Sequence, residues 1–275
     1  MALSADHPRR LIGRATAWPR SSLSHTPRVR ADETELGSAI ERLASQWPTY
    51  GYRRLTALLC REGRLVNGKR LARLMGWMGL AGRPPQRTPR TTDSRHDFPR
   101  FANLVEGLAV ESPEQVWVAD ITDVRLPSDF VDLAVVMDVF PRVSRGWELS
   151  RSLDGALTLS ALRRALRIAR PRIHHSDQGV QYAAADYVEQ LRRRGVSISM
   201  AAVGVPEENG DAERLMRTIK EEEVALSDYR DFADARRQLG RFLDEVDNHK
   251  RIHSALGDLT PAEFAERWKA DRGRV

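Results

Sequence analysis

The sequence contains only one cysteine, Cys60, among its 275 residues. A single thiol cannot form an intramolecular disulfide, and it leaves no second cysteine for a His-His-Cys-Cys zinc module. Cys60 ends an apolar run, residues 55–60, so we interpret it as a thiol of the core rather than a nucleophile. This cysteine content is typical of a protein of the reducing cytoplasm.

Long hydrophobic stretches are also absent. No apolar run approaches the roughly 20 residues that span a bilayer, and residues 1–10 lack the continuous apolar core of a signal peptide. We therefore expect a cytoplasmic location and no membrane partner. With 41% hydrophobic and 30% charged residues, the chain has the composition of a globular protein, long enough for one large domain or for a medium domain and a small one.

Three acidic residues stand out by their surroundings. Asp120 lies inside an apolar, strand-like run, Asp177 follows a second short strand, and Glu213 lies early in a helical stretch. Only tertiary folding can bring them together, and clustered carboxylates repel one another. A fold that gathers three of them normally does so to hold hard divalent cations. Two such cations about 3.5–4 Å apart can clamp the attacking and leaving oxygens of a phosphoryl transfer.

The segments around these acids carry a resemblance. The chain is similar to OrfB-type transposases of the insertion-sequence-three family, which have a retroviral-integrase-like catalytic core. Each motif alone is modest, but their order and spacing are specific, and the resemblance covers about residues 31–268. The matching segments are VWVADIT (116–122), HHSDQGVQY (174–182), ENGDAER (208–214), TIKEE (218–222) and HKRIHSALG (249–257).

This resemblance implies an α/β, ribonuclease-H-like catalytic core preceded by a small three-helix, helix-turn-helix-like domain. It implies that Asp120, Asp177 and Glu213 form a catalytic triad that binds Mg²⁺ or Mn²⁺. The implied activity is cleavage of DNA at insertion-sequence ends and strand transfer, on the nucleoid of a bacterial cell. The implied partners are end and target DNA, further copies of the chain, and an OrfA protein that is separate or fused.

Hydrophobic periodicity gives the expected organisation. We expect a flexible tail at 1–30, a helix-turn-helix-like domain at 31–83, a basic Pro/Thr/Arg linker at 84–112 and an integrase-type core at 113–270. The sequence predicts helices at 36–46, 52–61, 68–78, 158–169, 186–194, 206–225 and 231–253. It predicts strands at 116–124, 130–139, 143–151, 172–175 and 197–200.

Positive charge is concentrated in the front of the chain. Residues 1–100 contain 19 Lys and Arg against 8 Asp and Glu, whereas residues 101–275 contain 25 against 30. This balance favours a DNA-binding region joined to a metal-dependent one. An equal alternative is that the arginine content reflects a GC-rich genome. Lys69, Arg70 and Arg73 are expected on the outer face of the third helix, available to DNA phosphates. For each alone, a solvated surface is the alternative.

Two further groups of candidates lie near the acids. Glu213, Arg217 and Lys220 are spaced to share one helix face, and the resemblance supports Lys220 as a contact to the DNA end. The alternative is an ordinary surface ion pair between Glu213 and Arg217. Gln178 and Gly179 are expected to shape the loop that holds Asp177, Gly179 by permitting close backbone approach.

Four histidines are weaker candidates. We expect His174 and His175 to support the loop rather than bind metal, with one side chain pointing inward and the other outward. His249 and His253 are interpreted as structural or close to DNA, because no metalloprotease motif accompanies them.

The chain departs from the family pattern at four aspartates. They occupy places where related transposases often carry an aromatic residue, and they are Asp123, Asp132, Asp211 and Asp247. Extra carboxylates near the triad could retain metal while weakening the approach of phosphate. Two alternatives therefore stay open beside the transposase: a catalytically impaired DNA-binding remnant, and a ribonuclease-H-type nuclease.

Overall fold

A five-stranded mixed sheet forms the centre of the computed structural model, which describes residues 31–80, 99–202 and 205–272. Three strands form an antiparallel meander and two more add in parallel to its first strand, giving the order β3-β2-β1-β4-β5. The strands are β1 (Val116–Arg125), β2 (Phe130–Asp138), β3 (Val143–Ser150), β4 (Ile173–Ser176) and β5 (Ser197–Met200). The expected tail at 1–30 and the linker residues 84–98 lie outside the described ranges.

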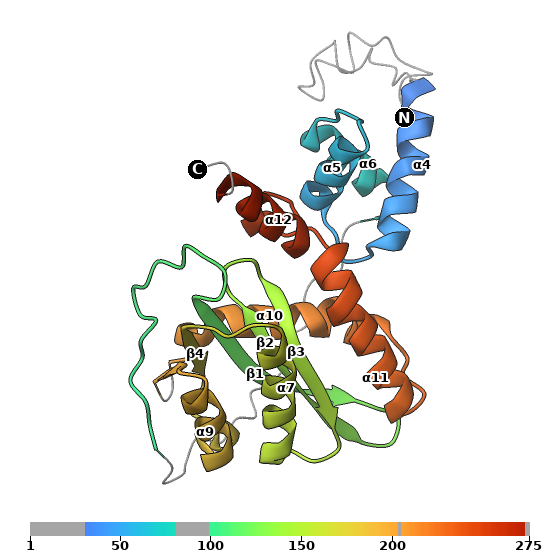
Figure 1. The fold of residues 1–275 in the computed structure, drawn as a ribbon. Coiled ribbons are helices and arrows are strands. Elements are labelled where there is room, and N and C mark those ends of the chain that lie inside the picture. Colours follow the sequence, from blue (N-terminus) through green and yellow to red (C-terminus); the bar gives the residue numbers. More distant parts are fainter. Residues whose placement is uncertain (1–30, 81–98, 203–204, 273–275) are drawn as a thin grey trace, which may run out of the picture.

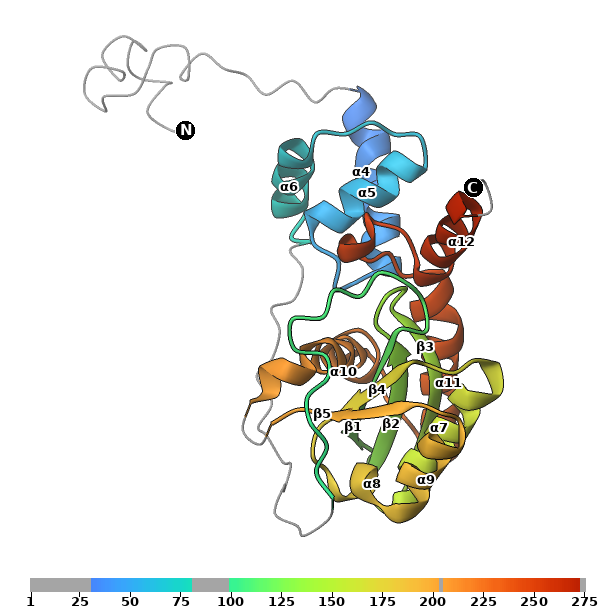
Figure 2. The same cartoon turned by 60° about the vertical axis from the view of Figure 1, so that its left-hand side comes forward.

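Both faces of the sheet are covered by helices, as Figures 1 and 2 show. Side chains of β1 alternate between two cores: Val116 and Val118 join one core, and Trp117 and Ala119 join the other. The first core lies against α10 (Gly210–Glu222) and α11 (Phe232–Arg241). The second lies against α7 (Gly155–Ile168), α8 (Val180–Ala183) and α9 (Ala185–Arg193). The result is a sandwich of helix, sheet and helix.

Two glycines allow close contact between helices and sheet. A Cβ at Gly146 of β3 would lie 2.4 Å from the Ala161 carbonyl oxygen of α7. A Cβ at Gly240 of α11 would lie 2.7 Å from Cζ2 of Trp147. Both distances are shorter than real contacts, so larger residues would force α7 and α11 away from the sheet.

Three helices precede the sheet and pack around their own core. They are α4 (Ala31–Gln46), α5 (Tyr52–Arg61) and α6 (Gly68–Trp77), and α4 starts five residues before the predicted helix. Their core includes Ile252 from the far end of the chain. The interpretation of Cys60 as a core thiol is wrong: it is exposed, because α5 buries Leu55 and Leu59 and the next residue turns about 100° away.

The two long helices predicted near the C-terminal end are shorter and irregular. A 3₁₀ turn at Pro206–Asn209 precedes α10, which ends at Glu222 rather than at residue 225. After α11 the helix continues with π-type geometry over Phe242–Asp247 and ends before Arg251, so the predicted span to residue 253 is too long. The predictions also missed α8 and α12 (Pro261–Arg272). No helix in the described ranges is long and apolar enough to cross a membrane.

Candidate active site

Strand register places two of the three acids side by side. Ala119 of β1 pairs with Ser176 of β4 in parallel register. Asp120 lies inside β1 and Asp177 directly follows β4, and each comes after one of these partners, so the two acids stand at the same level of adjacent strands. Glu213 lies in the first turn of α10, which packs against β1. All three side chains are partly exposed, as a site that meets a polymer requires.

Polar side chains tie the start of α10 to both strands. The Asn209 side-chain amide donates to the Ala119 carbonyl, 3.3 Å away. The His175 ring contacts the Glu208 carbonyl at 3.0 Å through Nε2 and the Ser199 hydroxyl at 2.8 Å through Nδ1. These bonds join β1, β4, β5 and the turn before Glu213. They were not predicted as positioning contacts, although Glu208 and Asn209 lie within the ENGDAER motif.

The negative charges of Asp177 and Glu213 both affect the pKa of Asp120. Burial raises the pKa of Asp120 to about 7, and the negative charges of Asp177 and Glu213 add to this rise. The Ile121 amide, which donates to Asp120 Oδ1 at 2.8 Å, and the charge of Lys220 act in the opposite direction. The carboxylates therefore repel one another, and a cation between them would relieve that repulsion.

The loop after Asp177 is built as the sequence indicated. The Gly179 amide donates to Asp177 Oδ1 at 3.0 Å. A Cβ at Gly179 would lie 3.0 Å from the same oxygen and 3.2 Å from Oε1 of Gln181. The Gln178 side-chain amide donates to the Ala201 carbonyl at 3.0 Å. Gly179 thus permits a close approach of backbone to Asp177, and Gln178 ties the loop to the end of β5.

His174 and His175 are both buried, which corrects the expectation that one would point outward. β4 is an inner strand with helices over both faces, so alternation here directs each side chain into protein. Burial, followed by the charge of His175, lowers the pKa of His174 to about 3. Its Nε2 lies 3.0 Å from the Tyr187 hydroxyl. The contacts of His174 and His175 agree with the prediction that these histidines support the loop.

The residues around the triad suit a hard cation in their donor chemistry. The Tyr182 hydroxyl is buried without a hydrogen-bond partner in the described structure, as is the side-chain oxygen of Asn209. Burial raises the pKa of Tyr182, and the charges of Tyr187, Asp120 and Asp177 raise it further. Among the described residues, no three His, Cys, Asp or Glu side chains are gathered as closely as the ligands of a single ion.

The two cations expected on the face of Glu213 differ in their surroundings. Lys220 Nζ lies 2.9 Å from Oδ1 of Asp123, one of the four unusual aspartates. Arg217 is exposed and forms no ion pair within the described ranges, so the proposed Glu213–Arg217 surface pair is not formed. The site therefore offers one open cation and one that is already neutralised.

The other unusual aspartates have distinct environments. Asp211 contacts Arg142 at 3.0 Å. Asp132 stands opposite Asp123 in the β1–β2 register; burial, followed by the charge of Asp123, raises its pKa. Asp247 is fully buried, and neither of its carboxylate oxygens accepts a hydrogen bond within the described structure.

The predicted basic face of α6 is only partly confirmed. Lys69 and Arg73 are exposed, and the Arg73 guanidinium lies 5.0 Å from the ring centre of Trp77. Arg70 is half-buried, with its guanidinium 3.5 Å from Glu33 of α4. It faces the neighbouring helix because it lies one position before the buried Leu71.

The sequence analysis missed an ionic cluster between the three-helix unit and α10. Glu222, the last residue of α10, accepts two hydrogen bonds of 2.7 Å from the buried Arg251 and one of 3.0 Å from Arg54 of α5. Both Glu222 and Arg251 lie in motifs that the sequence analysis singled out. His253 lies 3.5 Å from Asp247 in the same cluster, which suits its structural interpretation, whereas His249 is exposed.

The fold and the site together define a class. A mixed sheet of this order, with acids on β1, after β4 and on α10, is the ribonuclease-H-like architecture of integrase catalytic cores. Family models described as "Integrase core domain" match residues 110–206 and 194–261, and one described as "HTH-like domain" matches residues 31–88. These matches confirm the predicted fold class.

Known relatives narrow the class. The chain is 34% identical to the IS600 uncharacterized 31 kDa protein of Shigella sonnei, over 80% of this chain and 82% of that protein. It is 32% identical to the transposase InsF for insertion sequence IS3A of Escherichia coli K12, over 78% of this chain and 76% of that protein. The chain belongs to the insertion-sequence transposase family that includes these proteins, and its class of activity is DNA transposition.

A solved structure has a similar fold over most of the chain. It is the simian T-cell lymphotropic virus intasome in complex with PP2A regulatory subunit B56 gamma. The match has a TM-score of 0.51 and 17% identity, and it covers 82% of this chain and 74% of that one. At this identity the likeness concerns the fold alone.

Proposed function

We propose that the chain cleaves and joins DNA strands at the ends of an insertion sequence, with Asp120, Asp177 and Glu213 as its catalytic carboxylates. The observation that supports this most is the strand register that places Asp120 beside Asp177, with Glu213 in the first turn of the helix that packs against β1. Three separate elements carry these carboxylates to one end of the sheet, where their negative charges repel one another. The family membership supplies DNA as the substrate.

Divalent ions are the proposed cofactor, Mg²⁺ or Mn²⁺, with Asp120 and Asp177 sharing one ion and Glu213 completing a second site beside Asp120. Bound there, the ions would lower the pKa of the attacking hydroxyl and stabilise the departing oxygen. The chain's own residues orient the acids: the Ile121 and Gly179 amides fix one oxygen each of Asp120 and Asp177. Asn209 fixes the start of the helix that carries Glu213.

DNA outside the cleaved bond would be held by cations of two regions. We assign Arg217, and Lys220 once it leaves Asp123, to the DNA end beside the loop of Gln178 and Gly179. We assign Lys69 and Arg73 of the three-helix unit, residues 31–83, to phosphates of the same duplex, with Arg70 in a lesser role. Assembly of several copies on DNA, and an OrfA partner, complete the proposal.

The test is Mg²⁺-dependent nicking of a duplex that contains the element's end. Asp120→Asn, Asp177→Asn and Glu213→Gln should each abolish nicking while leaving the fold intact, as judged by circular dichroism. Glu207→Gln is the matched control, because it removes an exposed carboxylate from the turn before α10. Retained nicking by Asp177→Asn would overturn the assignment of the triad.

A further inference from the structure

The catalytic core contains a concentration of arginines that the triad does not use. Residues 163–172 read RRALRIARPR, with five arginines in ten positions, and residues 192–194 add three more. The first group occupies the second half of α7 and the loop that follows it, and the second group ends α9. This concentration is local, because residues 101–275 contain more acidic than basic side chains.

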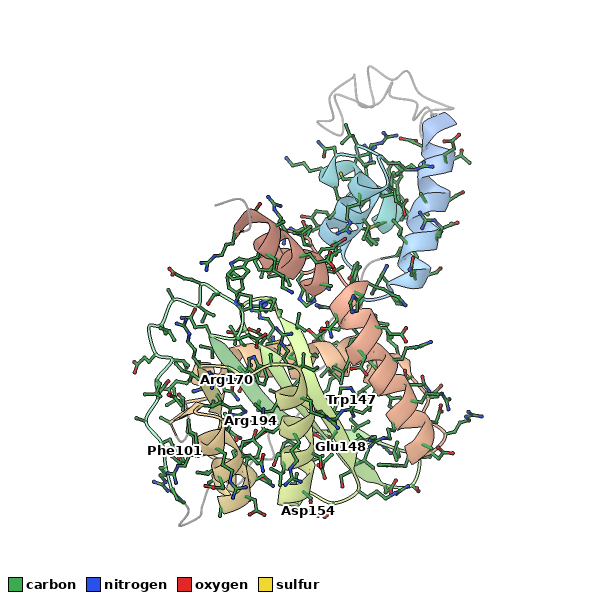
Figure 3. The ribbon with its side chains drawn as sticks, viewed as in Figure 1. Phe101, Trp147, Glu148, Asp154, Arg170 and Arg194 are labelled. Carbon is green, nitrogen blue, oxygen red and sulfur yellow. The ribbon has the colours of Figure 1, made fainter. Side chains whose placement is uncertain are left out.

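The fold gathers four of these eight arginines, together with Arg236 of α11, around one groove of about 660 Å³. Glu148 is the one carboxylate among the described residues that line it, and Figure 3 labels Glu148 and Arg194 beside α7. The carbonyl ends of α7 and α9 favour positive charge in their last turns. The charged lining consists of Arg163, Arg164, Arg167, Arg194, Arg236 and Glu148.

Several of these guanidinium groups are held in place without losing their charge. Arg194 donates to the Leu166 carbonyl at 3.2 Å. The Arg164 guanidinium lies 4.4 Å from the ring centre of Trp147. Carbonyls and aromatic rings orient a guanidinium but do not neutralise it, so its remaining N–H groups stay available to an anion.

Charge compensation within the groove is incomplete. Arg236 is paired with Glu148 and donates to the Leu149 carbonyl at 3.2 Å. Arg163 and Arg167 are exposed, and neither forms an ion pair within the described ranges. They stand one helical turn apart on α7, a spacing of about 6 Å. The groove thus presents a row of positive charges with a single negative one.

The groove lies away from the catalytic acids. The Leu153 carbonyl, just before α7, accepts a hydrogen bond of 3.4 Å from Gln181, four residues after Asp177. The N-terminal end of α7 is therefore at the catalytic end of the sheet. The helix has 14 residues, so Arg167 lies about 20 Å further along its axis. A phosphate group bound there is therefore not the phosphate at the bond being cleaved.

We propose that this arginine groove binds the phosphate backbone of duplex DNA outside the cleaved end. Arginine forks match phosphate geometry, and an open groove with several unneutralised charges suits a polymer with one charge per about 1.7 Å of axis better than a single small anion. Binding there is independent of base sequence. The inference rests on the proposed function for DNA as its ligand, but binding can be measured without cleavage.

The experiment compares Arg163→Gln/Arg167→Gln with Arg125→Gln/Lys269→Gln in the full chain. The control pair removes two exposed cations that have no ion-pair partner in the described ranges. Binding is measured by fluorescence anisotropy at several salt concentrations without divalent metal, with one duplex that ends at the cleavage position and one that continues about 30 base pairs beyond it. On the long duplex, the groove variant should lose about 1.8 units from the slope of log affinity against log salt, and the control pair none.

Three results would contradict the proposal. The first is an unchanged salt slope in the groove variant whose thermal melting is normal. The second is an unchanged slope together with an altered sedimentation coefficient, which would make this face a contact between copies of the chain. The third is displacement of the long duplex by millimolar inorganic phosphate, which would indicate a small-anion site. Wild-type protein that binds the long duplex through the groove but never nicks it would refute the proposed function alone.

Discussion

Lys220 stands two turns beyond Glu213 on the catalytic helix, and its ammonium contacts Asp123 at 2.9 Å. Asp123 is also opposite Asp132 across the β1–β2 ladder, so the lysine stabilises one member of a pair of like charges. The same contact competes with any phosphate that approaches Lys220. At the scale of single residues, Asp123 thus lowers the positive charge that Lys220 can present to DNA.

Asp123→Asn should therefore strengthen binding to an end-containing duplex. The substitution releases Lys220 and removes a negative charge, so the slope of log affinity against log salt should steepen by about one unit. Asp123→Tyr, which also removes the carboxylate, should act in the same direction and preserve nicking. Asp129→Asn is the matched control, because it also releases an arginine, Arg151, away from the triad. Equal effects of the Asp123 and Asp129 variants would contradict a specific role for Lys220.

Among the elements, α10 has a double function, because one helix carries both Glu213 and Glu222. Its first turn is fixed to β1 through Asn209, and its last residue is fixed to α5 through Arg54 and to the segment after α11 through Arg251. The Ile252 amide donates to the Tyr50 hydroxyl beside this cluster at 3.2 Å. The helix that carries Glu213 is therefore attached at its far end to the three-helix unit.

Glu222→Gln should destabilise the folded chain by about 3 kcal/mol, because Arg251 would stay buried without its closest counter-ion. Burial alone would raise the pKa of Glu222, but hydrogen bonds and charge from Arg251, then Arg54, lower it. A lowered pKa means that this stabilisation is complete above pH 4.5, the ordinary value, and is lost as the pH falls below it. Urea unfolding at pH 7 and at pH 3.5 measures both effects. Glu221→Gln, on the neighbouring residue, is the control, and equal unfolding midpoints for the two variants would refute the ionic role.

The face of α6 gives a second prediction at this scale. Lys69→Ala and Arg73→Ala should each reduce the salt slope of DNA binding by about 0.9 units, because both side chains are exposed. Arg70→Ala should change it less, since Glu33 already lies 3.5 Å from that guanidinium. Anisotropy titrations of the three variants decide the point. A larger loss for Arg70→Ala than for Lys69→Ala would show that the ion pair opens on DNA.

The sequence predicted some elements well for a physical reason. Strand β5 has the predicted bounds, because a short apolar run between turn residues has few alternatives. The predicted bounds of the two long helices were wrong because a 3₁₀ turn and a π-helical stretch interrupt them. Both depend on tertiary contacts, such as those that bury Asp247 and Asn248, which no local pattern contains. The motifs singled out Asp120, Asp177 and Glu213 as candidates, and their catalytic role stays a prediction. The tethers made by His175 and Asn209, and the arginine groove, required knowledge of which elements become neighbours.

At the scale of the whole molecule, negative and positive charges lie in separate regions. The triad places three carboxylates at one end of the sheet, and the arginine groove lies about 20 Å along α7 from that end. The three-helix unit adds Lys69 and Arg73 above the core, as Figure 1 shows for α6. A duplex that reaches more than one of these regions would be held at both, while the repulsion within the triad remains until cations enter.

This repulsion should be measurable as a stability difference in the metal-free protein. The pKa of Asp120, raised to about 7 by burial and then by Asp177, exceeds its ordinary value of 3.8. The folded state therefore binds a proton more tightly than the unfolded state, so stability falls as the pH rises from about 4 to about 7. Asp120→Asn should remove this loss and raise the free energy of unfolding at pH 8 by roughly 2–4 kcal/mol.

Adding Mg²⁺ should make the melting temperature of wild type higher than that of Asp120→Asn, the reverse of the order without metal. Because an ion that binds only the folded state adds stability, wild type in 10 mM Mg²⁺ should gain in melting temperature, whereas Asp120→Asn should gain little. Thermal melting at pH 5 and pH 8, in EDTA and in Mg²⁺, measures both effects, with Asp271→Asn as an exposed control. If Asp120→Asn melts below wild type at pH 8 in EDTA, Asp120 stabilises the empty site and the proposed repulsion is wrong. If it instead gains as much from Mg²⁺ as wild type does, the ion binds elsewhere and Asp120 is not a ligand.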